Sequence, residues 1–514
     1  MPLTAQSSKE THAAQNAALI LLSLVFLPLD TFILFISLLY SLFISSAAEK
    51  SRRAALRTPG FRPRTVLVTG VGMSKGLTLT RIFYAAGHTV IGADFETPFL
   101  PTTCGRTSIA LKKFMRLQRP HGSSGALAYA KSVVDIIVQE KVDLWVSCSG
   151  VASAIEDGMA KEMVEGLTSC RAIQFDVPTT QKLHEKHSFM EYTKSIGLAI
   201  PDTHTVTSKT AILSLLEPSR CKDRRYILKY IGTDDSVRAN MTLLPLDTPS
   251  ATKEYLSRIE VSTERPWILQ QYIAGPEYCT HAVVIEGEVK AFVSCPSAEL
   301  LMHYEALPQT SALSQSMLRF TQEYAAAGGQ SFTGHLSFDF MVEAGEAEAA
   351  KRDATRQVKL YPIECNPRAH TAVVLFGNTP EMAAAYTSIL NNTTSPPAGT
   401  TKHEQLTNGN AQKPVFPHKP ARFHWIGHDL VNKLILPVSR LLTAKDASLQ
   451  LLVHDLMTFL HYGLRWKDGT YEIWDPWPAW WLYHIYWPAQ FAVALVLGRK
   501  WSRVNVSTCK MFMC

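Results

Sequence analysis

The sequence predicts an α/β protein organised around a parallel sheet, with a long apolar segment near its N-terminus. Short apolar runs recur after residue 64: the first is Thr65-Val-Leu-Val-Thr-Gly70, and others cover residues 89–94 and 142–147. Helical patterns lie between them, as at residues 126–139. Strands that alternate with helices at this spacing are typical of a parallel sheet covered by helices. A chain of 514 residues can hold two or three such packed units.

Residues 1–64 predict attachment to a membrane. Residues 16–45 are almost wholly apolar, with Asp30 as the one charged residue. About 20 apolar residues are enough to span a bilayer. Pro28 and Asp30 leave two interpretations, one tilted span or a re-entrant hairpin, and a buried core helix is the alternative without a membrane.

A basic cluster follows the apolar segment directly. Its members are Lys50, Arg52, Arg53, Arg57, Arg62 and Arg64. Because positive charge is retained on the cytosolic side of a membrane, we expect a membrane-anchored protein with the rest of the chain, and so any catalytic domain, facing the cytosol.

Cysteine usage and charge narrow the class of protein. Nine cysteines are scattered along the chain without a C-x-x-C pair, which favours reduced thiols over a disulfide framework or a zinc site. The formal charge of +7 is spread out apart from the basic cluster, so no nucleic-acid partner is expected.

The rest of the chain divides into five parts by pattern. The parallel-sheet pattern covers residues 65–180, and two further units follow at 181–275 and 276–391. Residues 392–422 are rich in Thr, Pro, Asn, Gln and Gly and predict a flexible linker. Residues 423–514 hold most of the tryptophans. Since tryptophan favours the membrane interface, we expect a second membrane contact in this region, with an aromatic core as the alternative.

A glycine-rich turn in the first unit admits an alternative function. Gly70-Val-Gly72-Met-Ser-Lys75-Gly76 follows a predicted strand, and Asp94 lies where a ribose-binding acid would stand in a dinucleotide fingerprint. A Rossmann-type NAD(P) oxidoreductase is therefore the rival class. No tyrosine is followed four residues later by lysine, as short-chain dehydrogenases require. We favour the interpretation in which the glycines serve the turn and close helix packing.

The sharpest chemical signal is Glu364-Cys-Asn366-Pro-Arg368 at the end of a predicted strand. Glu364 and Asn366 are two apart, so their side chains point the same way. Their oxygens are hard donors of the kind that Mg2+ prefers. Asp339 lies on the polar face of the strand pattern at residues 336–340. If the two strands pair antiparallel, Asp339 joins the cluster, and Arg368 reaches a transferring phosphoryl group.

Cationic residues and a second strand precede that cluster in the chain. Lys229 ends the apolar strand Tyr226-Ile-Leu-Lys229, and Lys186 begins a helix. Lys229 could hold a phosphate as a point charge. A further strand, Trp267-Ile-Leu-Gln270-Gln271-Tyr272-Ile273, leads through a glycine turn to Glu277.

The order of these residues resembles the ATP-grasp superfamily over about residues 65–391. The resemblance implies an α+β fold with a Rossmann-like domain (65–180), a lid subdomain (181–275) and a catalytic subdomain (276–391). It implies that ATP is contacted by Lys186, Lys229, Glu277 and the hinge residues Gln270, Gln271, Tyr272 and Ile273. It further implies that Asp339, Glu364 and Asn366 hold Mg2+ (or Mn2+), and that Arg368 and Lys229 act in catalysis. Ser236 and Arg238 stand where many relatives have a glycine-rich phosphate loop.

A closer resemblance is to the mycosporine-glycine synthase group of ATP-grasp enzymes. Cys279-Thr-His281 and the histidine in Glu364-Cys-Asn-Pro-Arg-x-His370 carry it, together with the tryptophan-bearing tail. The resemblance implies that His281 and His370 shape an acceptor pocket, with structural histidines as the alternative. It implies an ADP-forming carbon–nitrogen ligase that joins a small molecule to an amino acid, such as 4-deoxygadusol to glycine.

Three points stay open at this stage. The pathway could instead make an amino-acid-derived fungal alkaloid. A catalytically dead, membrane-bound nucleotide-binding module would keep the same fold without turnover. A homodimer is compatible with the resemblance.

Overall fold

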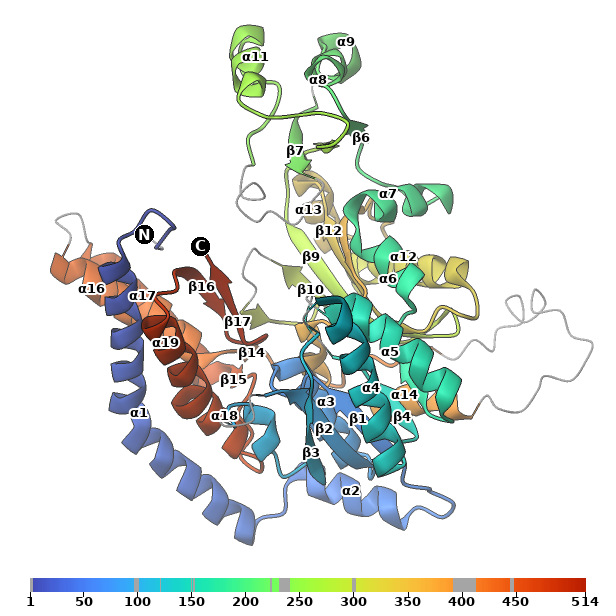
Figure 1. Ribbon diagram of the computed structural model, residues 1–514, viewed down its shortest axis with the longest axis vertical. Helices are drawn as coiled ribbons and strands as arrows, with labels where there is room; N and C mark the ends of the chain where they lie inside the picture. Colours follow the sequence, from blue (N-terminus) through green and yellow to red (C-terminus); the bar gives the residue numbers. More distant parts are fainter. Residues whose placement is uncertain are drawn as a thin grey trace, which may run out of the picture.

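The protein is a mixed α/β molecule, which confirms the predicted fold class (Figure 1). The computed structural model describes residues 3–514 except 97–100, 121, 149, 151–152, 222–223, 231–240, 298–301, 392–412 and 444–447. Ser236 and Arg238 therefore lie outside the described residues, as does most of the predicted linker.

The first unit contains the predicted parallel sheet. Its strand order is β3 (Lys113–Leu117), β2 (Thr89–Phe95), β1 (Thr65–Thr69), β4 (Leu144–Val146) and β5 (Arg171–Ile173), and all four pairings are parallel. Helices α3 (Ser74–Ala85), α4 (Gly122–Glu140) and α5 (Ala154–Leu167) connect and cover the strands. Val66, Leu67 and Val68 are fully buried, as expected for a central strand covered on both faces.

A small sheet stands at the top of the molecule in Figure 1. Its order is β6 (Thr203–Val206), β8 (Trp267–Gln271) and β7 (Tyr226–Tyr230), with antiparallel pairing throughout. It packs against α8 (Lys209–Leu215), α9 (Pro218–Cys221) and α11 (Pro249–Ser257) around Leu228, Leu269 and Trp267. Helices α6 (Val177–His184) and α7 (Lys186–Ser195) lead into this unit.

A four-stranded antiparallel sheet forms the centre. Its order is β10 (Glu288–Ser297), β9 (Glu277–Ile285), β12 (Gly334–Met341) and β13 (Tyr361–Asn366). Phe338 and Phe340 lie fully buried in the core that β12 forms with α12 (Ala312–Gly328). Helix α13 (Ala344–Arg352) follows β12, and η3 (Thr371–Phe376), α14 (Glu381–Thr387) and η4 (Ser388–Leu390) follow β13.

The link between these two sheets is held against the central one. The Ala344 amide donates to the Ala274 carbonyl at 3.0 Å, and the Val342 amide donates to the Pro276 carbonyl at 3.1 Å. Gly275 lies between these contacts, where an added Cβ would meet the Val342 carbonyl oxygen at 1.9 Å. Only glycine fits this position, so the link enters β9 at a fixed place.

The C-terminal region packs against the parallel sheet and the four-stranded central sheet. Strands β14 (Phe423–His424) and β15 (Lys467–Asp468) join β11 (His303–Tyr304) in a small sheet. Helical segments follow in the order α15 (Ile426–Asp429), η5 (Leu430–Ile435), α16 (Leu436–Thr443), α17 (Leu449–Arg465), α18 (Trp477–Trp481), η6 (Leu482–Tyr486) and α19 (Trp487–Val496). A hairpin of β16 (Trp501–Asn505) and β17 (Lys510–Met513) ends the chain. Trp425, Trp487 and Trp501 are buried, so part of the tryptophan-rich region forms an aromatic core.

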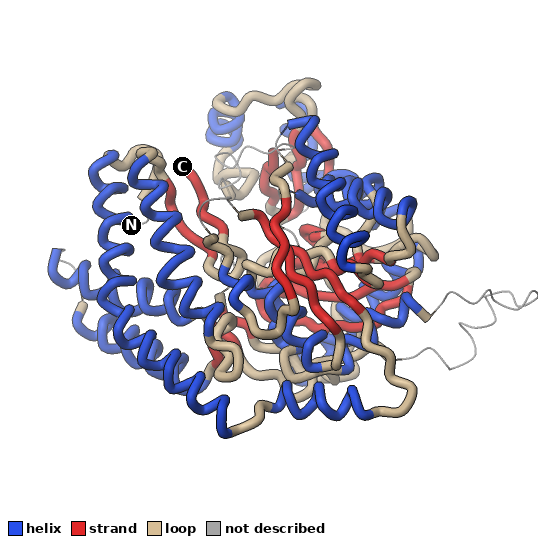
Figure 2. The backbone as a smooth tube through the Cα atoms, turned by 60° about the horizontal axis from the view of Figure 1, so that its bottom comes forward, coloured by secondary structure: helices blue, strands red, loops and turns tan. Residues whose placement is uncertain are grey.

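The N-terminal segment is one long helix, α1 (Lys9–Phe43), followed by the basic helix α2 (Ala47–Arg57). Among the described residues, this is the one stretch of helix long and apolar enough to cross a membrane, judged by length and composition. Because α1 continues through Pro28 without interruption, the re-entrant hairpin is wrong. Figure 1 places α1 beside α19 along one side of the molecule, and Figure 2 shows helices packed side by side along one side of the molecule.

Candidate active site

The predicted acidic cluster forms on β12 and β13. The two strands pair antiparallel with Asp339 directly opposite Glu364, which confirms the pairing on which the sequence argument depended. The Asn366 side-chain amide donates to Asp339 Oδ2 at 3.1 Å. Since Phe338 and Phe340 take the core positions of β12, alternation turns Asp339 to the other face.

The two carboxyl groups have opposite electrostatics. Burial, and then the negative charges of Glu364 and Glu277, raise the pKa of Asp339 to about 8. Burial also opposes ionisation of Glu364, but Lys186, Arg368 and Lys229 outweigh it and lower the pKa of this carboxyl. The cluster thus holds one ionised carboxylate and one that becomes a strong ligand when a cation arrives.

Both predicted lysines face this cluster. Lys186 Nζ lies 3.3 Å from Glu364 Oε2, at the first turn of α7. Lys229 Nζ donates to Gln270 Oε1 at 2.6 Å across the β7–β8 pair. Burial, and then the neighbouring charge of Lys186, lower the pKa of Lys229 to about 7. The positive potential of the two lysines favours an anion between the sheets.

The predicted hinge residues occupy the end of β8 and the link that follows. Gln270 is buried and donates to Thr203 Oγ1 at 3.3 Å, while Gln271 Oε1 accepts from the Asp202 amide at 3.2 Å. The amide of Tyr272 donates to the Arg225 carbonyl at 2.7 Å. Ile273 is buried, and Glu277, at the start of β9, accepts from Ser297 Oγ at 2.7 Å.

Two buried polar atoms in the cluster lack a partner among the described residues. They are Asn366 Oδ1 and Arg368 Nη1. A buried acceptor and a buried guanidinium donor without partners are costly, so each indicates a missing ligand. The oxygens of Asp339, Glu364 and Asn366 fit the hard-donor preference of Mg2+, and the free Arg368 nitrogen fits an anionic oxygen.

The predicted acceptor histidines lie next to this cluster. His281 Nδ1 accepts from the His370 amide at 3.3 Å, and His370 Nδ1 accepts from the Ala372 amide at 3.2 Å. Burial lowers the pKa of His281 well below its ordinary value and that of His370 to about 3. Both rings are therefore neutral and carry their proton on Nε2, and His281 Nε2 is buried without a described partner.

One group of ligand atoms joins His370 to the acidic cluster. Atoms of Cys279, Asp339 and His370 lie within 4.8 Å of one another. The Cys279 thiol contacts the Cys295 thiol at 3.3 Å, and this contact, followed by burial, raises the pKa of Cys279. A neutral thiol is a poor ligand for a hard cation, so Cys279 serves as a wall of the site.

The sequence argument missed two residues of this region, Lys75 and His335. Lys75, on α3, is buried and donates to the Ala369 carbonyl at 3.0 Å. Burial, and then the charge of Arg368, lower its pKa to about 8. His335 Nε2 lies 2.8 Å from the Tyr386 hydroxyl, and its ring is 5.5 Å from that of His281. The position of Lys75 in the glycine-rich turn was the one available signal.

The glycine-rich turn is closed by the protein itself. Gly72 donates its amide to Asp94 Oδ2 at 2.7 Å, and the Ser74 amide at the start of α3 donates to the Ser507 carbonyl at 2.9 Å. An added Cβ at Gly76 would meet the Gly70 carbonyl oxygen at 2.3 Å. These contacts favour the interpretation in which the glycines serve packing, and they count against the NAD(P) alternative.

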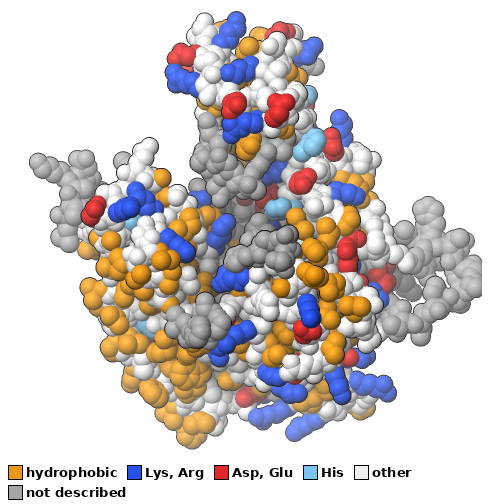
Figure 3. All heavy atoms as spheres, in the orientation of Figure 1, with side chains coloured by type: hydrophobic (Ala, Val, Ile, Leu, Met, Phe, Trp, Pro, Cys, Tyr) orange, Lys and Arg blue, Asp and Glu red, His pale blue; other side chains and the backbone are white. Residues whose placement is uncertain are grey.

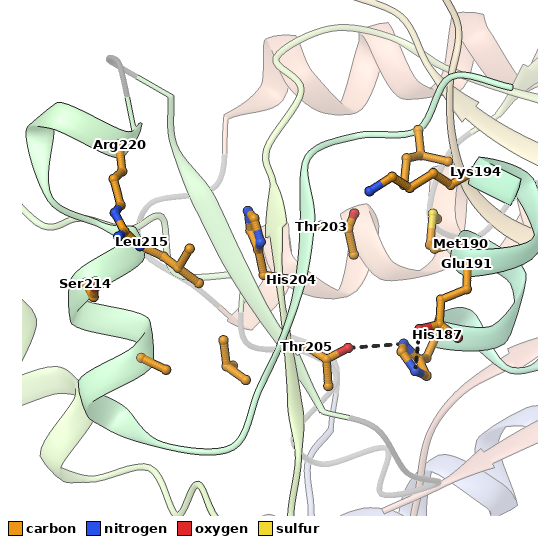
Figure 4. A pocket seen from close by; sticks show the side chains of 13 residues that line it. His187, Met190, Glu191, Lys194, Thr203, His204, Thr205, Ser214, Leu215 and Arg220 are labelled. Carbon is orange, nitrogen blue, oxygen red and sulfur yellow. Dashed lines mark hydrogen bonds and ion pairs between the residues drawn. The ribbon is translucent and has the colours of Figure 1, made fainter. Parts of the chain in front are cut away.

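A pocket of about 600 Å³ lies beside the site, between α7, β6 and α8. Figure 4 shows His187, Glu191 and Lys194 on one side of the strand that carries Thr203 and Thr205, and Ser214, Leu215 and Arg220 on the other. None of the sequence-predicted site residues lines this pocket. It separates α7 from the helices of the upper unit.

Comparisons with known proteins give structural likenesses at low identity. No protein-family model and no curated protein matches the chain. An L-amino acid ligase from Bacillus licheniformis is 14% identical, with a TM-score of 0.38 over 60% of this chain and 67% of that one. N5-carboxyaminoimidazole synthetase from Staphylococcus aureus, complexed with ADP, is 14% identical with a TM-score of 0.42 over 65% and 78%. An ADP complex of an N5-carboxyaminoimidazole ribonucleotide synthetase is 11% identical with a TM-score of 0.47 over 78% and 98%.

Proposed function

We propose that this protein is an ADP-forming ligase of the ATP-grasp type, which phosphorylates an acceptor oxygen and joins the acceptor to an amine. The main support is that Asp339, Glu364 and Asn366 lie together, with Lys186 next to Glu364. In the same place, Asn366 Oδ1 and Arg368 Nη1 have no partner among the described residues. Such a set of oxygen donors and cations suits a metal-bound polyphosphate.

Each residue has a role in this proposal. Lys186 and Lys229 hold the phosphates, and Asp339, Glu364 and Asn366 hold Mg2+ or Mn2+. When bound, the metal neutralises charge that builds up during phosphoryl transfer. Ser236 and Arg238 would complete the phosphate contacts.

Adenine would contact the link that follows β8. The amides of Gln271 and Tyr272 are already donated to Asp202 and Arg225. Adenine contacts would therefore come from their carbonyls and from the backbone of Ile273, with Glu277 near the ribose.

The reaction divides into two displacements. An acceptor oxygen attacks the γ-phosphorus, the bond to the bridging oxygen breaks, and ADP leaves while Arg368 balances the shifting charge. The amine then attacks the carbon that bears the new phosphate, loses its proton, and expels phosphate. The site's main contribution is to hold the reactants in position and to exclude water.

The acceptor would be an anion. Lys75 and Arg368 supply positive charge on the side of the site where His281 and His370 offer neutral N–H donors. An enolate or a carboxylate fits this combination. From the motif resemblance, we propose 4-deoxygadusol and glycine as substrates, and an acceptor from an amino-acid-derived alkaloid pathway as the alternative.

The test is a coupled product assay with the purified full chain. ATP, glycine and 4-deoxygadusol should give ADP and phosphate in equal amounts together with the coupled product. AMP and pyrophosphate as products would contradict the chemistry. Nucleotide binding without any turnover, over a panel of acceptors, would instead support a binding module.

A further inference from the structure

The polar residues of α1 face the body of the protein. Asp30 Oδ2 lies 2.8 Å from His484 Nε2, and Ser23 Oγ donates to the Tyr483 carbonyl at 2.8 Å. Trp480 Nε1 donates to Thr31 Oγ1 at 3.0 Å. These bonds join the middle of α1 to α18 and η6.

The same contact continues to both ends of α1. Near the N-terminal end, Trp501 Nε1 donates to Asn16 Oδ1 at 2.9 Å. Near the C-terminal end, Ser37 Oγ lies 2.7 Å from the Tyr471 hydroxyl, and Ser41 Oγ donates to the Ile473 carbonyl at 3.3 Å. The helix therefore lies against the C-terminal region over nearly its whole length.

This arrangement is incompatible with α1 as an isolated transmembrane span. Its 35 residues are about 52 Å long, more than the hydrocarbon core of a bilayer. A bilayer perpendicular to α1 would also enclose the segments packed along the middle of α1, which are α18 and η6, together with the Asp30–His484 pair. Ionisable side chains and backbone groups outside regular helix are strongly unfavourable in the hydrocarbon core of a bilayer.

The outward face of α1 is apolar and continues over neighbouring helices. Figure 3 shows hydrophobic side chains gathered on the side where Figure 1 places α1, α16, α17 and α19. The exposed members on α1 are Leu21, Leu24, Val25, Leu29, Phe32, Ile33, Phe35, Ile36, Leu39, Tyr40, Leu42 and Phe43. Those on the other helices are Leu436, Val438, Leu441, Leu449, Leu451, Val453, Leu456, Met457, Leu460, Leu464, Val493, Leu495 and Val496. We call this surface the apolar face.

Basic side chains border the apolar face where α1 ends. Helix α2 exposes Lys50, Arg53 and Arg57, and Arg62 follows it. Figure 3 shows Lys and Arg gathered along the lower edge, where Figure 1 places α2. An apolar surface with a cationic border matches the hydrocarbon and the anionic headgroups of one membrane leaflet.

We propose that the apolar face inserts into one leaflet of an anionic membrane, with α1 lying along the surface and the whole chain on one side of the bilayer. The protein is then monotopic, and the candidate active site stays in water next to the lipid. This binding depends on α17 as well as α1, which a single anchor helix would not require.

The first experiment compares two triple variants of the full chain in flotation with vesicles of phosphatidylcholine and phosphatidylserine. Leu451→Glu, Met457→Glu and Leu464→Glu place charges on α17. Leu127→Glu, Val138→Glu and Leu167→Glu make the same changes at exposed apolar positions elsewhere. The α17 variant should lose at least about tenfold in bound fraction while the control binds like the wild type. Equal binding of the α17 variant and the wild type would overturn the proposal.

The second experiment needs no substitution. Sealed vesicles carry protein with a protease-cleavable tag at each end, and protease is added outside. Both tags should be cleaved, because both ends lie on the same side. A protected N-terminal tag would mean that α1 crosses the bilayer.

A third measurement tests the competing occupant. If a second copy of the chain covered the apolar face, the wild type without lipid would form a discrete dimer that the α17 variant abolishes, and vesicles would bind neither. That result would also overturn the proposal.

Removing the α2 charges with Lys50→Gln, Arg53→Gln and Arg57→Gln should weaken binding to the anionic vesicles by about fivefold per residue, and less at high salt.

Discussion

The central site and the α1 contact region are built on opposite plans. At the site, β12 and β13 bury phenylalanines on one face and turn Asp339, Glu364 and Asn366 to the other, where two polar atoms have no partner in the described part of the chain. At α1, the polar side chains point inward and find partners, such as Asp30 with His484, while the apolar side chains point outward.

The two regions show two departures from the usual distribution of polar and apolar side chains, and each departure has its own meaning. A buried polar atom without a partner indicates a ligand that completes it. An exposed apolar surface indicates a solvent other than water. Changes at the site should therefore alter turnover and leave membrane binding intact, and changes at α1 should do the reverse.

The largest effect is expected from Glu364→Gln. Loss of this charge removes a ligand of the proposed metal site and the partner of Lys186, so ATP turnover should fall by about a hundredfold to a thousandfold. Steady-state ADP release measures it. Glu348→Gln, which alters an exposed ion pair with Lys351, is the matched control, and vesicle binding should match the wild type in both variants. A Glu364→Gln enzyme with normal turnover would remove the basis of the comparison.

A smaller effect is expected from Lys229→Met. The pKa of Lys229 is lowered to about 7, so the amine is mostly neutral above that pH. A bound polyphosphate favours the charged form, so binding takes up a proton and weakens as pH rises above 7. Calorimetry with metal-free ADP in buffers of different ionisation enthalpy should show proton uptake at about pH 8 and little at about pH 6.

The Lys229→Met variant should lose this proton uptake and about tenfold to a hundredfold in ADP affinity. Lys194→Met changes an exposed lysine on α7 and should leave both unchanged. Uptake that persists in Lys229→Met would assign the proton to another group.

Lys75→Gln tests the acceptor side of the site. Its amine is buried on α3 and bonded to the Ala369 carbonyl, and in our proposal it attracts an anionic acceptor. The KM for the acceptor should rise about tenfold, with ADP affinity little changed. A variant that loses ADP affinity instead would place Lys75 with the nucleotide.

The smallest effect is expected from Asp30→Asn on α1. This substitution removes the charge that faces His484, a histidine whose side chain is only 2% exposed. It should lower the free energy of unfolding by about 1 kcal/mol. Thermal unfolding in detergent measures this change, with exposed Asp135→Asn as the control. ATP turnover at low temperature should stay normal, and a selective loss of turnover would contradict the division between the two regions.

Local patterns predicted much of the candidate site. Alternation along two strands predicted that Asp339 joins Glu364 if the strands pair antiparallel, and the structure shows this pairing. The helix start at Lys186 was also correct. The roles of these residues stay predictions, as do the domain boundaries.

Long-range packing could not be predicted in the same way. Lys75 reaches the site only because α3 packs on the segment after β13, 294 residues away. The α3 start is covered by Ser507 from the end of the chain. The few polar residues of α1 are spread through a sequence as apolar as a transmembrane helix. The sequence therefore did not reveal that these residues share one face, which packs against the C-terminal region.

The partner of Asp30 lies 454 residues further along the chain. At the usual pace of a ribosome, on the order of a minute passes between synthesis of α1 and arrival of η6. Throughout that interval the long apolar helix α1 exists without the surface that receives its polar side chains. We expect a chaperone or the membrane itself to cover α1 until η6 is synthesised, so this helix reaches its final place only after the C-terminal region has been made.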